Sequence, residues 1–271
     1  ALVIFPLGRY DRGILIWKGT MALRTILWFL YFWLYLVVLL PRLRKAQRLD
    51  AAGELDARDA LVEPQVRKWA RSLLKKAGVE VEVSGLENIP GCSAVFVANH
   101  QSYFDIPVLL AWLDRPHPLV AKQEIRKIPL IRKWMELLDC VFIDRDNPRQ
   151  SVAALGTAAR NMTQRGRSFI IFPEGTRSRG DQVGEFKNGG FRVALKSGAP
   201  VVPVVIDGTY RAMEANHMWI HPAKVRLQVL PPIPTQGMDK EEAKGLGERV
   251  RDLIVQAKAA RQAGRPGRSR M

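Results

Sequence analysis

The chain has 271 residues, of which 47% are hydrophobic and 25% are charged, and this composition excludes a wholly disordered protein. Its two cysteines, Cys92 and Cys140, are too few for a disulfide scaffold and are compatible with a reducing compartment. The 42 Lys and Arg residues exceed the 26 Asp and Glu residues, giving a net charge of +16. Such an excess indicates a polyanionic partner, either nucleic acid or an anionic membrane surface.

The first predicted element is an apolar helix. Every residue from Ile26 to Leu40 is apolar or aromatic, and basic residues follow Pro41 directly. The run is shorter than the roughly 20 residues that span a bilayer, but its Trp and Tyr residues favour the headgroup region, and the basic residues favour anionic lipid. A buried core helix is the alternative. We expect residues 1–20 to be a non-native or disordered extension before a natural start at Met21.

A second helix is predicted over residues 65–77. Val66 and Leu73 belong to an apolar stripe at helical spacing, and basic residues fill most of the other positions. A basic amphipathic helix can lie in a membrane interface, and the alternative is an ordinary solvated surface helix. Residues 21–77 are therefore predicted to form a membrane-anchoring element of two helices, which either spans the bilayer or enters one leaflet.

From residue 78 to about residue 260 the sequence predicts an α/β domain, because short β-rich runs alternate with helical stretches. Most of the β-rich runs are solidly apolar, as expected for strands covered on both faces. We expect a layered, mixed sheet of about seven strands with flanking helices. The predicted strands are Val79–Val83, Ala94–Ala98, Leu119–Ala121, Val141–Ile143, Ser168–Phe172, Val201–Ile206 and Val225–Leu230.

Three helices of this domain have readable ends. Asn147 can cap a helix that begins at Pro148 and ends at Gly166. Two more are predicted over residues 188–196 and 239–260. The tail at residues 261–271, with arginines among Gly and Ser, is predicted to be disordered.

The segment NHQSYFD, residues 99–105, follows a predicted strand and leads into a predicted helix. Residues five apart on one helix point about 140° away from each other, so His100 and Asp105 can meet only if His100 precedes the helix and folds back over its start. Asp105 would then accept a hydrogen bond from one ring nitrogen and leave the other free as a base. By itself the pattern also fits a capping histidine beside a surface aspartate.

A tight turn is predicted in FPEGTRS, residues 172–178, because of Pro173 and Gly175. We expect it to expose the side chains of Glu174, Thr176 and Arg177. The planar fork of an arginine suits a phosphate, and free N–H groups of a Gly-containing turn add to an anion site. The alternative is a β-turn whose charges are solvated.

Two further cations lie at strand ends. Lys122 ends one predicted strand, and Arg145 follows another in the segment FIDR. If these strands are parallel, Lys122, Arg145 and Arg177 can converge on one phosphate beyond their carboxyl ends.

Taken in order, NHQSYFD, Lys122 through FIDR, FPEGTRS and then PVVPVVI at residues 200–206 resemble the glycerolipid acyltransferase family. The resemblance spans about residues 65–235 and is strongest to the bacterial 1-acyl-sn-glycerol-3-phosphate acyltransferases. It implies that His100 and Asp105 form the catalytic H-x4-D motif. It implies glycerol-phosphate binding by Arg145, Glu174, Gly175, Thr176 and Arg177.

The implied reaction moves an acyl chain from acyl-CoA or acyl-carrier protein to the sn-2 hydroxyl of lysophosphatidic acid, giving phosphatidic acid for phospholipid biosynthesis. His100 would take the hydroxyl proton, and Lys122 would assist the arginines at the phosphate. Because a thiol leaves readily, no metal or cofactor is expected. The expected partners are an anionic phospholipid membrane, with the catalytic domain on its cytoplasmic face, the two substrates and acyl-carrier protein.

Several alternatives remain. Within the family, the acceptor can be another lysophospholipid or glycerol-3-phosphate, and Arg132 and Asp139 replace frequent glycines in a way that bears on substrate preference. From another class, a membrane-tethered nucleic-acid-binding protein would explain the charge, but the basic residues flank apolar elements and do not interleave with aromatics, so no nucleic acid is expected. A serine hydrolase lacks its G-x-S-x-G, and Pro222 opposes a metal chelate by His217 and His221.

Overall fold

The computed structural model describes residues 10–144 and 146–263. All seven predicted strands are present within one or two residues of the predicted ends. Their bounds are β1 Val79–Ser84, β2 Val95–Ala98, β3 Val120–Lys122, β4 Val141–Ile143, β5 Phe169–Ile171, β6 Val201–Asp207 and β7 Ala223–Val229. Five strands form a mixed sheet in the order β1-β7-β6-β2-β5. The parallel pair β3-β4 continues it through a parallel bridge between Leu119 and Ile170.

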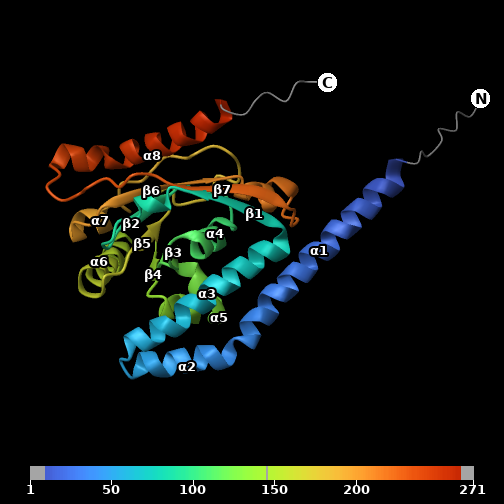
Figure 1. Ribbon diagram of the computed structural model, residues 1–271, viewed down its shortest axis with the longest axis horizontal. Helices are drawn as coiled ribbons and strands as arrows, with labels where there is room; N and C mark the ends of the chain where they lie inside the picture. The colour runs from blue at the N-terminus through green and yellow to red at the C-terminus, as the bar shows by residue number, and fades with distance from the viewer. Residues whose placement is uncertain (1–9, 145, 264–271) are drawn as a thin grey trace, which may run out of the picture.

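Helices cover both faces of the sheet, as Figure 1 shows. The domain contains α4 Asp105–Trp112, α5 Pro129–Leu137, α6 Pro148–Arg165, α7 Arg192–Ser197 and α8 Lys240–Ala263, with short 3-10 helices η1 Leu86–Asn88, η2 Gln123–Lys127, η3 Thr209–Ala212 and η4 Glu214–Asn216. On β2, Val95 and Val97 join the core under α6, α7 and α8, whereas Phe96 and Ala98 join the core under α3 and α4. All four side chains are buried, as the solidly apolar run predicted.

Two helix ends differ from the prediction. The cap at Asn147 is confirmed, since its side chain accepts a hydrogen bond from the N–H of Gln150, and Gly166 ends α6 in a left-handed conformation. However, α7 begins at Arg192 and not at residue 188, because two glycines, which disfavour helix, come first. Helix α8 continues to Ala263, so the predicted start of the disordered tail at residue 261 is wrong. Residues 264–271 lie outside the described part of the chain.

The strand directions decide where the functional side chains lie. β2 is parallel to both β5 and β6, and β3 is parallel to β4. Their carboxyl ends therefore share one edge of the sheet, while β7 runs antiparallel to β6. The strands that lead to Lys122, Arg145 and Arg177 are therefore parallel, as the predicted convergence of these cations requires.

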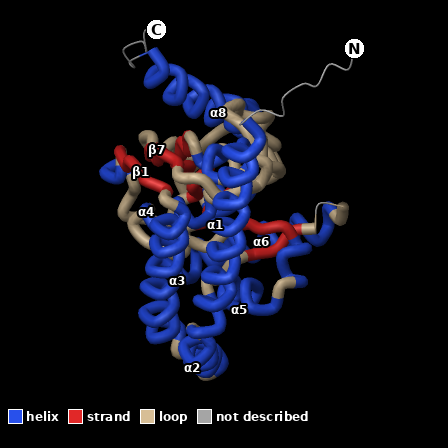
Figure 2. Tube along the Cα trace, turned by 90° about the vertical axis from the view of Figure 1, so that its right-hand side faces the viewer, coloured by secondary structure: helices blue, strands red, loops and turns tan. Residues whose placement is uncertain are grey.

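Three helices precede the domain: α1 Tyr10–Val38, α2 Leu40–Ala51 and α3 Leu55–Ala77 (Figure 2). Helix α1 begins before Met21, so no structural boundary falls there, and residues 1–9 lie outside the described range. The segment Thr20–Val38 is long and apolar enough to cross a membrane by length and composition, and only 11% of it is buried. Because a core helix would be mostly buried, this exposure favours the membrane reading of the apolar run.

Helix α1 is attached to α3 along one side. The guanidinium of Arg24 donates to the carbonyl of Ala77 at 2.7 Å, and the indole N–H of Trp28 donates to the carbonyl of Leu73 at 3.0 Å. The opposite side is a surface of large apolar side chains. It includes Leu23, Ile26, Leu27, Leu30, Leu34 and Val38, each more than half exposed. Exposed apolar surface of this extent marks an interaction site, here the candidate membrane element.

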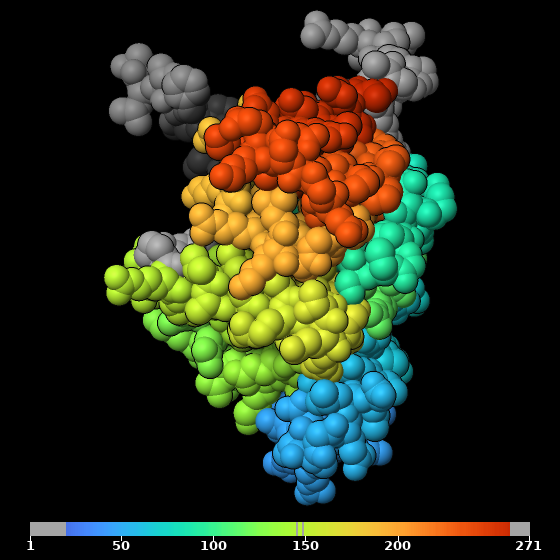
Figure 3. Space-filling view, turned by 90° about the vertical axis from the view of Figure 1, so that its left-hand side faces the viewer, coloured from blue at the N-terminus to red at the C-terminus, as the bar shows by residue number. Residues whose placement is uncertain are grey.

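The interfacial role predicted for the second helix is wrong for its apolar stripe. Val66 and Leu73 are buried as α3 packs against α4, so the stripe is used within the protein. The basic face of α3 stays exposed at Lys68, Arg71, Lys75 and Lys76. A second exposed basic face belongs to α2, where Leu43 and Ala46 are buried. Its exposed basic residues are Arg42, Arg44, Lys45 and Arg48. Figure 3, coloured along the chain, shows the α2–α3 turn at the end of the molecule away from α8.

Candidate active site

The site begins in the turn that follows β2. The side chain of Asn99 donates to the carbonyl of Ile206 and accepts from its N–H, both at 2.8 Å. This pair of bonds fixes the first residue of the turn to β6. The side chain of Asn99 is fully buried, so water does not compete for these bonds.

His100 and Asp105 are in contact, as the sequence predicted. Helix α4 begins at Asp105, and His100 lies before it with its ring folded back, so that Nδ1 is 2.7 Å from a carboxylate oxygen of Asp105. Because an ionised carboxylate only accepts, Nδ1 carries the proton, and Nε2 is left with a free lone pair. The histidine side chain is 15% exposed and the aspartate side chain is fully buried, so the pair is reached through the imidazole.

Three further donors hold the carboxylate of Asp105. The N–H groups of Gln101 and Ser102 donate to the same oxygen as the imidazole, at 2.6 and 2.9 Å. The hydroxyl of Thr209 donates to the other oxygen at 2.5 Å. Every bond favours an acceptor-only, ionised carboxylate, which keeps the imidazole in one tautomer and one orientation.

Thr209 reaches Asp105 because of the turn at Gly208. Gly208 has φ +97°, and a Cβ at this position would lie 2.5 Å from the carbonyl oxygen of Lys224, so only glycine fits. Its N–H donates to the side-chain oxygen of Gln101 at 3.0 Å. The segment after β6 is thereby attached at two points to the segment of residues 99–105 that holds His100.

The FPEGTRS segment packs directly on His100. The predicted tight turn is present, with the N–H of Gly175 donating to the carbonyl of Phe172 at 3.0 Å. The ring of Phe172 stacks on the imidazole with centroids 4.1 Å apart. The N–H of Ser178 donates to the carbonyl of His100 at 2.8 Å. Two segments more than 70 residues apart are thus joined at the edge formed by β2 and β5.

The prediction that this turn exposes the side chain of Glu174 is wrong. Glu174 is buried, and its two carboxylate oxygens accept from the N–H groups of His100 at 2.7 Å and Gly184 at 3.0 Å. Burial raises the pKa of Glu174, and these two hydrogen bonds oppose the rise. Glu174 thus links the backbone at His100 to the backbone at Gly184, while Thr176 is exposed as predicted.

Arg177 contacts the segment that holds His100 and Asp105, through the ring of Tyr103. Its guanidinium carbon is 3.4 Å from the ring centroid of Tyr103, and its Nη1 is 3.8 Å from a carboxylate oxygen of Glu214. Lys122 is half exposed and pairs with Glu124 at 2.5 Å, so its charge is partly matched within its own segment. Arg145 lies outside the described residues.

The sequence analysis did not predict a role in this site for Gln101, Tyr103, Thr209 or Glu214, nor for Asn99, Ser102 and Phe172. Thr209 and Glu214 lie beyond β6. The sequence pointed to them only through the apolar composition of β6, which suits a parallel neighbour of β2. No group of three or more His, Cys, Asp or Glu side chains able to hold a metal ion occurs within residues 10–144 and 146–263.

Comparison with known proteins gives one consistent result. An acyltransferase family model matches residues 80–207. A 1-acyl-sn-glycerol-3-phosphate acyltransferase of Borreliella burgdorferi is 32% identical over 180 residues, 66% of this chain and 72% of the relative. One from Cocos nucifera is 31% identical over 185 residues, 68% of this chain, which spans 60% of that relative's length. The crystal structure of the 1-acyl-sn-glycerophosphate acyltransferase PlsC from Thermotoga maritima is 30% identical, with a TM-score of 0.73 over 90% of this chain and 98% of that one.

Proposed function

The chain belongs to the acyltransferase family, and on that basis we propose that it acylates the sn-2 hydroxyl of 1-acyl-sn-glycerol 3-phosphate to give phosphatidic acid. The observation that carries the proposal is the hydrogen bond between His100 and Asp105, placed beside a loop that presents Arg177. The named relatives support the choice of acceptor.

His100 is the general base of the proposed reaction. Its Nε2 takes the proton of the acceptor hydroxyl as that oxygen attacks the thioester carbonyl, and Asp105 stabilises the imidazolium that results. The tetrahedral intermediate then collapses, the carbon–sulfur bond breaks, and the imidazolium returns the proton to the thiolate. Phe172 and Glu174 keep the imidazole in place through ring stacking and the backbone hydrogen bond.

Arg177 is proposed to hold the acceptor phosphate, with Lys122 and Arg145 adding positive charge at the same edge. Gly175 and Thr176 shape the loop that carries Arg177. Holding the phosphate at a fixed distance from His100 places the hydroxyl next to the base, and such positioning supplies much of the rate of a reaction between two substrates. No cofactor is proposed, and the acyl donor is either acyl-CoA or acyl-carrier protein.

We propose that α1 and α2 attach the enzyme to an anionic membrane with the catalytic domain on the cytoplasmic side. The support is an exposed apolar helix followed at once by an exposed basic one, the order that the positive-inside rule gives to a cytoplasmic flank. Protease digestion of the domain in inverted vesicles, but not in intact cells lacking a cell wall, is the expected result. Digestion from the outside would refute this orientation.

The test of the activity is an acyl-transfer assay with purified protein in mixed micelles. Lysophosphatidic acid is compared with glycerol 3-phosphate and lysophosphatidylcholine, and acyl-CoA with acyl-carrier protein as donor. We expect lysophosphatidic acid to be the preferred acceptor and His100→Ala to lower kcat by at least about 10²–10⁴-fold. Near-normal turnover by folded His100→Ala, or a clear preference for an acceptor other than lysophosphatidic acid, would refute the proposal.

A further inference from the structure

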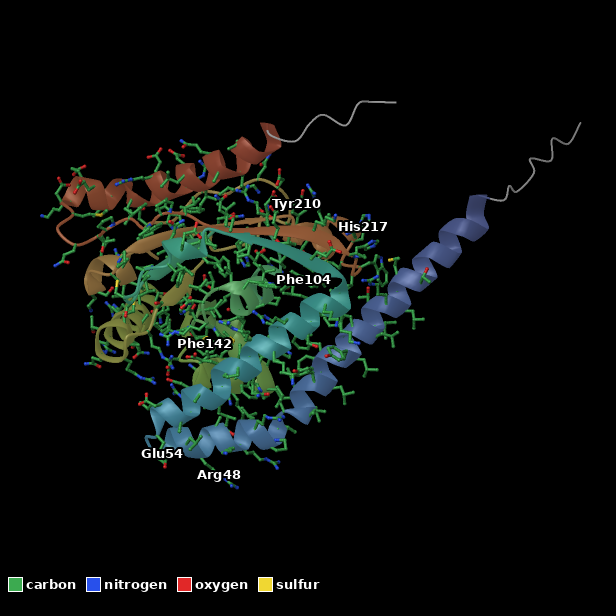
Figure 4. The ribbon with its side chains drawn as sticks, in the orientation of Figure 1. Arg48, Glu54, Phe104, Phe142, Tyr210 and His217 are labelled. Carbon is green, nitrogen blue, oxygen red and sulfur yellow. The ribbon has the colours of Figure 1, made fainter. Side chains whose placement is uncertain are left out.

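We propose that Tyr103 and Glu214 form a platform that positions Arg177 for the phosphate of the acceptor. The proposal rests on the proposed function and assigns positioning roles to two residues, one inside the H-x4-D turn and one beyond β6. The segment that contains Glu214 lies between Tyr210 and His217, both labelled in Figure 4 near the same end of the sheet.

Arg177 is held by an aromatic ring and an ion pair. Its guanidinium lies over the face of the Tyr103 ring at 3.4 Å, and its distance to Glu214, 3.8 Å, is that of an ion pair without a hydrogen bond. Within residues 10–144 and 146–263, no hydrogen bond joins the guanidinium to a protein acceptor. Contact with an aromatic face fixes a guanidinium through its plane and leaves its N–H groups free. Arg177 is therefore oriented while its donors stay available for a phosphate.

The platform is fixed to residues 102 and 103 through Glu214. Glu214 has a side chain that is only 2% exposed, and both of its oxygens accept hydrogen bonds from the catalytic turn. One accepts from the N–H of Tyr103 at 2.8 Å, and the other accepts from the hydroxyl of Ser102 at 2.6 Å. The hydroxyl of Ser102 in turn accepts from the N–H of Phe104 at 3.0 Å. The backbone that carries the Tyr103 ring is thus held by a buried carboxylate.

The exposure of Tyr103 supports a role for its ring outside the core. The residue is 53% exposed, whereas its neighbours Ser102 and Phe104 are buried. Phe104 packs against Trp28 of α1 with ring centroids 5.4 Å apart, so the turn is anchored by Phe104 and does not need the tyrosine ring for packing. We therefore assign the exposed Tyr103 ring the role of contacting Arg177.

The consequence is a fixed spacing between base and phosphate site. Tyr103 lies in the same turn as His100 and Asp105, so the platform ties Arg177 to the residues that carry out the proton transfer. A reactive hydroxyl and a phosphate on one small acceptor need such a fixed spacing, because small errors in placement cost much of the rate.

The experiment compares Tyr103→Leu with Tyr103→Phe, which keeps the ring and removes the hydroxyl. Tyr103→Leu is expected to raise the KM for lysophosphatidic acid by about threefold to thirtyfold, the range of an arginine–aromatic contact, with kcat changed less than KM. Tyr103→Phe should match the wild type. The inhibition constant of inorganic phosphate should rise in Tyr103→Leu by the same factor as KM, a coupling that a general loss of stability would not produce.

The matched control is Tyr210→Leu, which removes a tyrosine ring that contacts Arg211 at 5.4 Å in the neighbouring segment. It should leave KM unchanged. Glu214→Gln keeps side-chain shape and an acceptor for Tyr103, and it should give a smaller rise in KM than Tyr103→Leu. An unchanged KM in Tyr103→Leu, or an equal rise in Tyr103→Phe, would overturn the platform.

The two proposals can fail separately. Binding of lysophosphatidic acid is measured by titration calorimetry in the His100→Ala background, with and without Tyr103→Leu. Weaker binding in the double variant supports the platform even if the wild type shows no acyl transfer, which would refute the proposed function alone. Equal binding in the two variants, with wild-type turnover intact, would refute the platform alone.

Discussion

Asp105→Asn is the sharpest test of the catalytic pair, because it preserves shape and removes only charge. One oxygen of the carboxylate accepts from the imidazole of His100 and from the N–H groups of Gln101 and Ser102, and the other accepts from the hydroxyl of Thr209. An asparagine can keep its oxygen at the first position. Its amide N–H2 then faces Thr209, whose hydroxyl can turn to accept.

The magnitudes follow from the loss of charge. A hydrogen bond to a charged group is worth about 1.5–3 kcal/mol and one between neutral groups about 0.5–1.5 kcal/mol, so each of the three bonds at the shared oxygen weakens by about 1 kcal/mol. Stability should fall by about 3 kcal/mol at most, since the variant no longer buries a charge. The imidazolium formed at His100 loses its counter-charge, and kcat should fall by about 10³–10⁴-fold.

The assay measures thiol release at saturating acyl-CoA, with the melting temperature recorded for each variant. The KM for lysophosphatidic acid should change little, because the phosphate is held at Arg177. The control is Asp252→Asn, an exposed carboxylate on α8. A folded Asp105→Asn with kcat within about tenfold of the wild type would refute the counter-charge argument. Combining it with His100→Ala should add little further loss, since the two residues act as a unit.

Three more predictions come from the same structure. Burial raises the pKa of the Glu174 carboxyl above its usual 4.5. The stability that Glu174 contributes is therefore complete below pH 4.5 and is lost as the pH rises through the folded-state pKa. The difference in unfolding free energy between wild type and Glu174→Gln should fall with rising pH, and a constant difference would contradict this. Asp139→Gly should relieve the backbone strain of a φ of +63°, worth about 1 kcal/mol. The protein should nevertheless lose about 2–4 kcal/mol of stability net, because three arginines lose a shared carboxylate that is only 10% exposed. Urea unfolding measures the sign of the change. Replacing the exposed basic residues of α2 with glutamine should weaken binding to anionic vesicles at low salt but not at high salt; co-sedimentation that is insensitive to the substitutions would refute an electrostatic role for α2.

The strands could be predicted from sequence because each is a solid apolar run, and burial on both faces needs nothing else. Helix α2 was not among the two helices predicted for residues 21–77. Pro41 lies in the first turn of α2, where its missing N–H costs nothing. The strand register and the order of the sheet depend on contacts between distant segments, which a single sequence does not reveal.

The contact between His100 and Asp105 could be predicted because both residues lie within seven residues of one turn and helix start, whose geometry is local. Glu174 could not be placed correctly, since the two N–H groups that turn it inward belong to His100 and Gly184, and neither is a neighbour in the chain. Thr209 and Glu214 could not be predicted for the same reason, since their bonding partners are also distant in the chain. Side chains that act across strands are predictable only once the order of the strands is known.

The net charge also divides into two parts that composition could not distinguish. Arg58 and Arg167 are almost fully buried and share the carboxylates of Asp59 and Asp139, in a cluster that joins α3 to the domain. Charges neutralised in this way attract no lipid, and their role is to fix the N-terminal helices against the α/β domain. The exposed basic face of α2, by contrast, has no acidic residue in its first turn and directly follows the apolar α1. The excess charge that can act on a membrane therefore lies on exposed helix faces, on α2 and also on α3, where Lys68, Arg71, Lys75 and Lys76 are exposed. The buried ion pairs of Arg58 and Arg167 hold these helices against the α/β domain.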